Sequence, residues 1–327
     1  MKEAFYYSRK DNGKLMCRLC PHNCLIAPGK HGLCRVRINK EGKLFTENYA
    51  MISSLNIDPI EKKPLYHYYP GTEVFSIGSY GCNLACQYCQ NWQISQVKPS
   101  LREIPPALLV EAAKKTGSPA IAYTYSEPSV WYEYIRDTAP IAREAGLKNI
   151  MITNAYISTE ALEDLIPYLD AVNVDLKAFS GEFYRKYCRG SLTPVLENIR
   201  LLYRSGVHIE LTTLLINGYN DSRDEIRDLL SWVKSLSPDI PVHFSRYFPA
   251  YRFEEPATPL EKMKEIFQLA EDHLNFVYLG NVNLEAGNDT SCPVCDCLLI
   301  KRNYYQVKSI LKKAECPECG QPVYGKY

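Results

Sequence analysis

The spacing of thirteen cysteines constrains this chain more than any other feature of its sequence. Twelve of them fall into three clusters, and only Cys188 stands apart. The clusters contain four, three and five residues: Cys17, Cys20, Cys24 and Cys34; Cys82, Cys86 and Cys89; Cys292, Cys295, Cys297, Cys316 and Cys319. In a reducing compartment, closely spaced cysteines bind metals rather than form disulfides. We therefore expect a central domain with a three-cysteine site between two small metal-binding modules.

The composition is that of a globular protein, with 327 residues, 46% hydrophobic and 23% charged, and a net charge of +1. This charge gives no reason to expect a nucleic-acid partner or an anionic membrane surface. The first ten residues lack the apolar segment of a secretory signal, and no run approaches the ~18 apolar residues of a membrane span. We expect a cytoplasmic protein.

The central segment alternates short β-branched or aromatic runs with amphipathic stretches. Strands are expected at 73–79, 120–125, 149–153, 171–175, 208–216 and 241–245, with a short seventh at 276–279. Helices are expected at 108–116, 130–145, 159–168 and 195–205. Two more open at the capping boxes Ser222 with Glu225 and Thr258 with Glu261, the second with Pro259 at its first helical position. This alternation predicts βα units and a parallel sheet.

Six or seven βα units fit a full or partial TIM-like barrel, and a doubly wound open sheet is the alternative. In both folds functional groups gather at the C-terminal ends of the strands. We divide the chain into an N-terminal cysteine-rich module (1–71), a barrel (72–285) and a C-terminal zinc-ribbon or rubredoxin-like module (286–327).

The loop after the first expected barrel strand reads SYGCNLACQYCQNW, with the spacing C-x3-C-x2-C. Cys82, Cys86 and Cys89 can hold three irons of a 4Fe–4S cluster, which leaves the fourth iron free to bind a small molecule. Electron-transfer clusters and structural zinc usually take four protein ligands. A zinc site completed by His67 or His243 is the alternative.

This loop, with Tyr88 as its aromatic residue, resembles the radical S-adenosylmethionine (SAM) superfamily, and most of all its pyruvate formate-lyase activating enzymes. The resemblance implies a 4Fe–4S cluster whose open iron chelates the amino and carboxylate groups of SAM. It further implies an oxidoreductase in which one electron, from a donor such as flavodoxin or ferredoxin, cleaves SAM to a 5′-deoxyadenosyl radical. That radical abstracts a substrate hydrogen.

Other positions extend the resemblance to cofactor-binding residues. Glu127, in YTYSEPS, is the residue that would hold the methionine amine, although Tyr-Ser-Glu stands where the family has Gly-Gly-Glu. Thr153 and Asn154 match a Thr-Asn-Gly motif in which Ala155 replaces the glycine. The resemblance therefore assigns these residues to the SAM site.

Asp175 and Lys177 match an Asp-Leu-Lys motif, whose lysine can approach the SAM carboxylate; a surface ion pair is the alternative. Cys188 is either a buried apolar filler or a substrate contact or radical relay. His243 and Arg246, on the sixth strand, are candidate catalytic groups, although a hydrogen-bonded core histidine is the favoured interpretation of His243 alone.

The C-terminal SCPVC and CPECG segments resemble the knuckles of rubredoxins and zinc ribbons. Cys292, Cys295, Cys316 and Cys319 are the expected ligands of zinc, and iron would also fit. Cys297 competes with Cys295 in this assignment. A module of ~40 residues has too little core to fold unaided, so the metal would supply its stability.

The N-terminal module reads CRLCPHNCLIAPGKHGLC, with the spacing C-x2-C-x3-C-x9-C. Cys17, Cys20, Cys24 and Cys34 suit zinc or a second iron–sulfur cluster. We favour zinc, because the sequence offers no independent support for an electron-transfer role.

Together, the Cys-Pro-His module, GCNLACQYCQNW, YTYSEP and CPECG resemble the radical enzyme of the prokaryotic AmmeMemoRadiSam system. This resemblance implies association with a Memo-like protein. The substrate is expected to be a protein or peptide side chain, as in activation of a glycyl radical enzyme, while a small molecule remains open.

Two other classes of function remain open. An iron–sulfur electron-transfer or scaffold protein would bind clusters without cleaving SAM. A zinc-ribbon binding module would carry zinc at all its cysteine sites on a degenerate barrel. The odd set of three cysteines on an intact βα frame argues against both.

Overall fold

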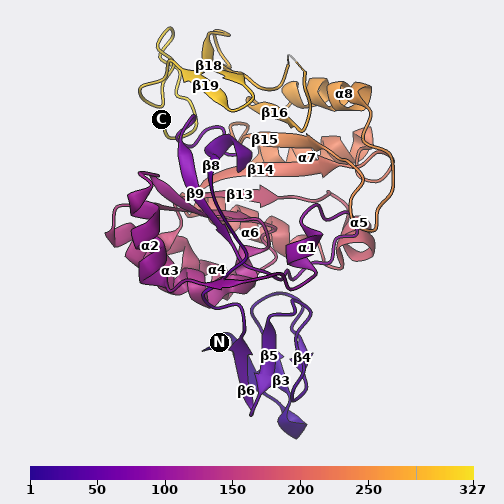
Figure 1. Ribbon diagram of the computed structural model, residues 1–327. Coiled ribbons are helices and arrows are strands. Elements are labelled where there is room, and N and C mark those ends of the chain that lie inside the picture. The colour runs from indigo at the N-terminus through magenta and orange to yellow at the C-terminus, as the bar shows by residue number, and fades with distance from the viewer. Residues whose placement is uncertain (285) are drawn as a thin grey trace.

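An eight-stranded sheet forms the centre of the computed structural model, which describes residues 1–284 and 286–327 (Figure 1). Its order is β16-β15-β14-β13-β12-β11-β9-β8. Seven strands are parallel: β9 (Glu73–Gly78), β11 (Ala120–Tyr123), β12 (Lys148–Thr153), β13 (Ala171–Asp175), β14 (His208–Leu215), β15 (Val242–Arg246) and β16 (Val277–Gly280). The eighth, β8 (Ser54–Pro59), joins β9 antiparallel, so a strand from before residue 72 completes the sheet.

The helices lie along one side of this sheet. They are α2 (Pro106–Lys115), α3 (Tyr132–Glu144), α4 (Thr159–Leu165), α6 (Thr193–Arg204), α7 (Arg223–Leu236) and α8 (Leu260–Glu271). Parallel strands that neighbour each other in chain order, joined by right-handed crossovers, place every crossover helix on the same face. The result is a partial barrel with open edges at β8 and β16, as expected, and not a doubly wound sheet.

Most strand and helix positions agree with the prediction, but the capping boxes hold only in part. Ser222 is the N-cap of α7, and its hydroxyl accepts from the Glu225 N–H at 3.3 Å. The Glu225 carboxylate does not close the box and accepts instead from the N–H of Phe179. The second box is wrong: α8 begins at Leu260 with Pro259 as its N-cap. The Thr258 hydroxyl donates to the Leu215 carbonyl, because this segment packs against the end of β14.

The N-terminal module lies at one end of the barrel and the C-terminal module at the opposite end (Figure 1). The N-terminal module holds two small sheets, β1 (Lys2–Glu3) with β6 (Lys43–Thr46) and β5 (Arg37–Lys40), and β2 (Tyr7–Arg9) with β3 (Leu15–Cys17) and β4 (Leu25–Ile26). The buried guanidinium of Arg37 pairs with Glu133 of α3. The backbone N–H of Phe5 donates to the same carboxylate at 2.8 Å, so this pair fastens the module to the barrel.

Short elements complete the fold. They are β7 (Met51–Ile52), which pairs with β10 (Arg102–Glu103), α1 (Trp92–Ser95), α5 (Gly181–Phe183), β17 (Thr290–Ser291), β18 (Leu298–Asn303) and β19 (Gln306–Ser309). The last three strands form the C-terminal sheet. No helix in the described ranges combines the length and apolar character that crossing a membrane requires.

A buried histidine joins the barrel to the C-terminal segment. His67 is fully buried, with its Nδ1 2.7 Å from the Tyr324 carbonyl and its Nε2 beside the Tyr278 hydroxyl of β16. With the proton on Nδ1, this nitrogen donates to the carbonyl and Nε2 accepts from Tyr278. The neutral imidazole therefore satisfies both partners.

Acid should weaken the fold through His67. Burial lowers its pKa to about 3, whereas the unfolded chain takes up a proton near the ordinary value of 6.5. From pH 7 to pH 5 the unfolded state thus binds more protons than the folded state. Protonation of His67 should therefore lower the free energy of unfolding by up to ~1.4 kcal/mol per pH unit below pH 6.5. Urea midpoints at pH 7, 6 and 5 should fall less steeply for His67→Asn. The exposed His31→Asn is the control, and equal slopes for wild type and His67→Asn would contradict the prediction.

Candidate active site

A large cavity opens at the C-terminal ends of the parallel strands. Its volume is about 560 Å³, and part of it is open to solvent. Cys82, Cys86 and Cys89 contribute to one wall. Polar side chains at or just after the ends of successive strands form another, namely Glu127, Asn154, Asp175, Lys177, Thr212 and Ser245. The parallel sheet therefore brings together groups that are far apart in sequence.

The three-cysteine loop follows β9 directly and ends where α1 begins. The Cys82 Sγ accepts from the Leu84 N–H at 3.3 Å and lies 3.7 Å from the Asn154 amide nitrogen. The Cys89 Sγ lies 3.2 Å from the Ser95 hydroxyl. These contacts fix sulfurs on one side of the cavity.

The donor set fits an iron–sulfur cluster better than a single ion. In the described residues, one group of three or more potential metal ligands has all its donor atoms within 4.8 Å of one another, and it lies in the C-terminal module. The three loop sulfurs are thus spread more widely, as ligands of three different irons must be. No further cysteine or histidine lines the cavity in the described part of the chain, so His67 and His243 do not complete a zinc site there.

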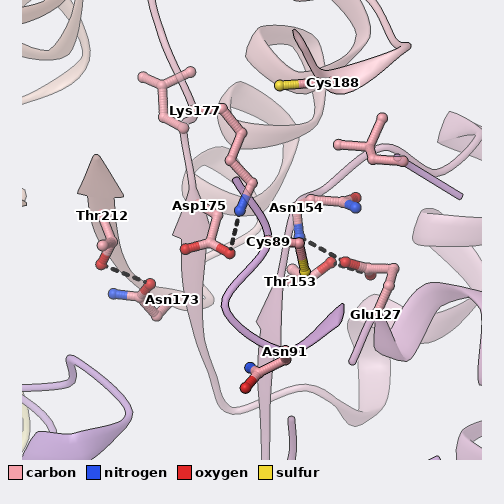
Figure 2. A network of polar contacts seen from close by, with 12 residues as sticks. Cys89, Asn91, Glu127, Thr153, Asn154, Asn173, Asp175, Lys177, Cys188 and Thr212 are labelled. Carbon is pink, nitrogen blue, oxygen red and sulfur yellow. Dashed lines mark hydrogen bonds and ion pairs between the residues drawn. The ribbon is translucent and has the colours of Figure 1, made fainter. Parts of the chain in front are cut away.

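Glu127 ties the ends of β11 and β12 together (Figure 2). Its buried carboxylate accepts from the Ser129 N–H at 2.9 Å, the Thr153 hydroxyl at 2.6 Å and the Asn154 N–H at 2.8 Å. Burial raises the pKa of Glu127, and these hydrogen bonds counteract the rise in part. The carboxylate orients Asn154 toward the loop, where its amide also bonds to the Asn83 side chain at 3.0 Å.

Two departures from the family motifs keep the backbone shape that glycine would provide. Tyr125 and Ala155 stand where glycine was expected, and both have positive φ, +69° and +51°. A left-handed conformation costs a non-glycine residue about 1–2 kcal/mol. At Tyr125 contacts offset this cost, because the hydroxyl donates to Asp58 and the Lys63 ammonium lies 4.5 Å from the ring centroid.

Asp175 and Lys177 form an ion pair of 2.7 Å at the end of β13, beside the cavity (Figure 2). Burial lowers the pKa of Lys177, but Asp175 and the Cys86 thiol raise it by more, so the ammonium stays charged. Its side chain is 19% exposed. Unlike a surface pair, this cation lies beside the cysteine loop and can meet an anionic group in the cavity.

Thr212, on the fifth expected strand, was a weaker candidate for nucleoside contact, and it lines the cavity. Its hydroxyl donates to the Asn173 side chain at 2.9 Å, and Asn173 in turn donates to the Pro64 carbonyl at 2.7 Å. Sequence reasoning missed Lys63, which lines the cavity and pairs with Asp58 at 2.7 Å. Residues 60–64 precede the barrel and carry no motif, so only the antiparallel pairing of β8 could have indicated their position.

Three candidates lie outside the cavity lining. Cys188 is fully buried, with its sulfur 3.1 Å from the Tyr88 hydroxyl. The Nε2 of His243 lies 2.7 Å from the buried carboxylate of Glu210, as expected for a core histidine. The Nε–H of Arg246 donates to the Thr258 carbonyl at 2.7 Å. Tyr88 itself lines the cavity, and Thr153 is buried beneath Glu127.

The C-terminal cysteines form a compact set. The sulfurs of Cys292 and Cys319 lie 3.6 Å apart, and those of Cys295 and Cys316 lie 3.7 Å apart. Bonds of ~2.3 Å to one tetrahedral ion place thiolate sulfurs about 3.8 Å apart. The spacing therefore fits a single ion. Cys295 belongs to this compact group and Cys297 does not.

Known sequences match this arrangement. The profile of the Radical SAM superfamily matches residues 76–233. The chain is 42% identical over 332 residues to an uncharacterized protein of Methanocaldococcus jannaschii, and the match covers 99% of both chains. It is 20% identical over 157 residues to a 4-hydroxyphenylacetate decarboxylase activating enzyme of Clostridioides difficile, covering 47% of this chain and 49% of that relative.

A solved structure shares the fold. Streptococcus suis SuiB bound to precursor peptide SuiA aligns with a TM-score of 0.51 and 15% identity, covering 68% of this chain and 52% of that one. The cysteine loop, the partial barrel, the matched profile and the full-length relative agree with one another. The chain belongs to the radical SAM superfamily.

Proposed function

We propose that this protein binds a 4Fe–4S cluster through Cys82, Cys86 and Cys89 and cleaves SAM reductively. The observation that carries the proposal is three separated sulfurs on the wall of a large cavity whose described lining offers no fourth cysteine or histidine. When bound, the cluster and SAM supply a 5′-deoxyadenosyl radical for hydrogen abstraction.

The residues of the chain bind and orient the cofactor in this proposal. The Lys177 ammonium, held by Asp175, pairs with the SAM carboxylate. Glu127 retains acceptor capacity for the methionine ammonium and keeps Asn154 directed at the loop. Thr212 and Ser245 lie on the wall formed by β14 and β15, where they can contact the nucleoside. The surrounding barrel limits access of water to the reaction.

A protein or peptide side chain is the substrate class that we propose. The cavity is open to solvent and large enough to admit a side chain. The name of the Clostridioides difficile relative describes activation of another enzyme, and the SuiB structure holds a peptide. A Memo-like partner and a flavodoxin or ferredoxin donor complete the proposal. None of the thirteen cysteines is in a disulfide, which supports a cytoplasmic location.

Cys86→Ala should abolish formation of 5′-deoxyadenosine, because two thiolates do not retain the cluster. The measurement is chromatography after anaerobic reconstitution with iron and sulfide, reduction and addition of SAM. Cys188→Ala is the matched control for the cluster, and its iron and sulfide content should equal that of the wild type. Retained cleavage in Cys86→Ala would refute the ligand assignment, and wild-type clusters without cleavage would indicate an electron-transfer protein.

Lys177→Met should weaken SAM binding about ten- to hundredfold, since hydrogen bonds to charged groups contribute ~1.5–3 kcal/mol. Equilibrium dialysis of the reconstituted protein against labelled SAM measures this change. Lys186→Met, on the exposed surface near the same loop, should bind as the wild type does. Equal affinities for the two variants would remove Lys177 from the site.

Cys316→Ala should release the metal of the C-terminal module, which we propose to be zinc or iron in a structural role. Residues 286–327 should then become sensitive to proteolysis, while the absorbance of the barrel cluster stays. Metal content per chain is the readout. Cys297→Ala, in the same module but outside the ligand set, should keep its metal, and loss in both variants would contradict this ligand assignment.

A further inference from the structure

The four N-terminal cysteines surround a cavity of their own. It is small, with about 10 Å³ of space for the centre of a water molecule, and all four cysteines line it together with His22 and Arg37. Cys17 ends β3, and the other three lie on the tight loops that follow. Gly32 packs closely against β4, because a β-carbon there would lie 3.2 Å from the Ile26 side chain. The loops thus direct the cysteines toward a common space.

The sulfur spacing in this cavity differs from that of the C-terminal site. There, facing sulfurs lie 3.6 and 3.7 Å apart, in van der Waals contact, which leaves room for one ion. In the described N-terminal module no three cysteine sulfurs lie mutually within 4.8 Å. Four thiolates that line one pocket without close sulfur contacts fit a polynuclear cluster, in which each thiolate binds a different iron. The N-terminal set therefore resembles the catalytic loop and not the zinc-type site.

The surroundings also suit an iron–sulfur cluster. Nη1 of Arg37 lies 3.8 Å from the Cys17 sulfur, and this guanidinium is buried and paired with Glu133. An N–H donor to a ligand sulfur, together with burial, tunes the reduction potential of such clusters. The Nε2 of His22 lies 2.7 Å from the Asn83 carbonyl, so that nitrogen donates its proton there and is not free for a metal.

This cavity lies against the catalytic loop. Gly81 is the residue before Cys82. A β-carbon added there would lie 2.7 Å from the Cys34 carbonyl oxygen. His22 bonds to Asn83, one residue after Cys82. Cys34, Val36, Tyr80 and Val130 form one apolar cluster between the two sites. The two cysteine sets are thus joined on both sides of the first catalytic cysteine.

We propose that Cys17, Cys20, Cys24 and Cys34 bind a second 4Fe–4S cluster that passes an electron to the catalytic cluster. A cluster at these cysteines departs from the zinc that the sequence alone favoured. The relay role of the cluster rests on the proposed function. One electron leaves a reduced flavodoxin- or ferredoxin-class protein and resides on the N-terminal cluster, lowering its charge from 2+ to 1+. The electron then moves to the catalytic cluster and finally breaks the sulfonium C–S bond of SAM. No proton is needed in this transfer.

The first test counts metal in the full chain after anaerobic reconstitution with iron, sulfide and zinc. The triple variant Cys82→Ala, Cys86→Ala, Cys89→Ala should retain about four irons and four acid-labile sulfides, half the wild-type cluster content. After reduction it should give a paramagnetic signal that SAM does not alter. Zinc without labile sulfide in this variant overturns the proposal.

A wild-type measurement keeps the proposal testable if the triple variant fails to fold. Reduced wild type should show two paramagnetic signals, of which SAM changes only one. Arg37→Lys should lower the midpoint potential of the signal that is insensitive to SAM and leave the other in place. A single signal, or a shift confined to the SAM-sensitive one, contradicts a second cluster beside Arg37.

The relay role has its own readout. The measured quantity is the rate of SAM cleavage with reduced flavodoxin divided by the rate with dithionite. This ratio should be at least tenfold lower than in the wild type when all four cysteines are replaced, in the variant Cys17→Ala, Cys20→Ala, Cys24→Ala, Cys34→Ala. An unchanged ratio removes the relay. Absence of cleavage in the wild type with either reductant would instead contradict the proposed function, so the two failures are distinguishable.

Discussion

The distance between cysteine sulfurs differs among the three cysteine clusters of this protein, and this distance limits which kind of metal centre each cluster can bind. In the C-terminal module, two knuckles press the sulfurs of Cys292 and Cys319 to 3.6 Å, which suits one tetrahedral ion. At the strand ends and in the N-terminal module, the loops hold the sulfurs further apart. The three cysteine sets therefore differ in sulfur spacing, although the ligand type is the same in all of them.

Backbone and side-chain hydrogen bonds hold the cysteine loop beside the apolar cluster that it shares with the N-terminal module. Asn83 is the junction: its carbonyl meets His22, and its amide donates to the Tyr156 carbonyl and contacts Ser129. Glu127 holds the neighbouring turn through three donors. Because an unsatisfied buried carboxylate is costly, this network has few alternative arrangements. Hydrogen bonds from three neighbouring segments thus hold the loop that carries Cys82.

Much of this arrangement could be predicted from the sequence, since buried parallel strands have apolar runs and metal knuckles have short cysteine spacings. β13 occurs where it was expected, and Lys177 lines the cavity at the end of that strand. Spacing along the chain, however, does not report distances between sulfurs in space. Cys297 could be excluded only from coordinates. Lys63 lines the cavity because β8 pairs with β9, and Asn173 supports the lining through its contacts with Thr212 and Pro64. Neither arrangement leaves a local pattern in the sequence.

The absence of a side chain at position 81 has a consequence for which sequences this loop can tolerate. A β-carbon at Gly81 would lie 2.7 Å from the Cys34 carbonyl oxygen and 2.6 Å from the Val36 side chain, so the small module packs against one flank of the cysteine loop. Any substitution there would push the backbone of the small module away from the loop. Position 81 therefore ties the evolution of the module to that of the barrel.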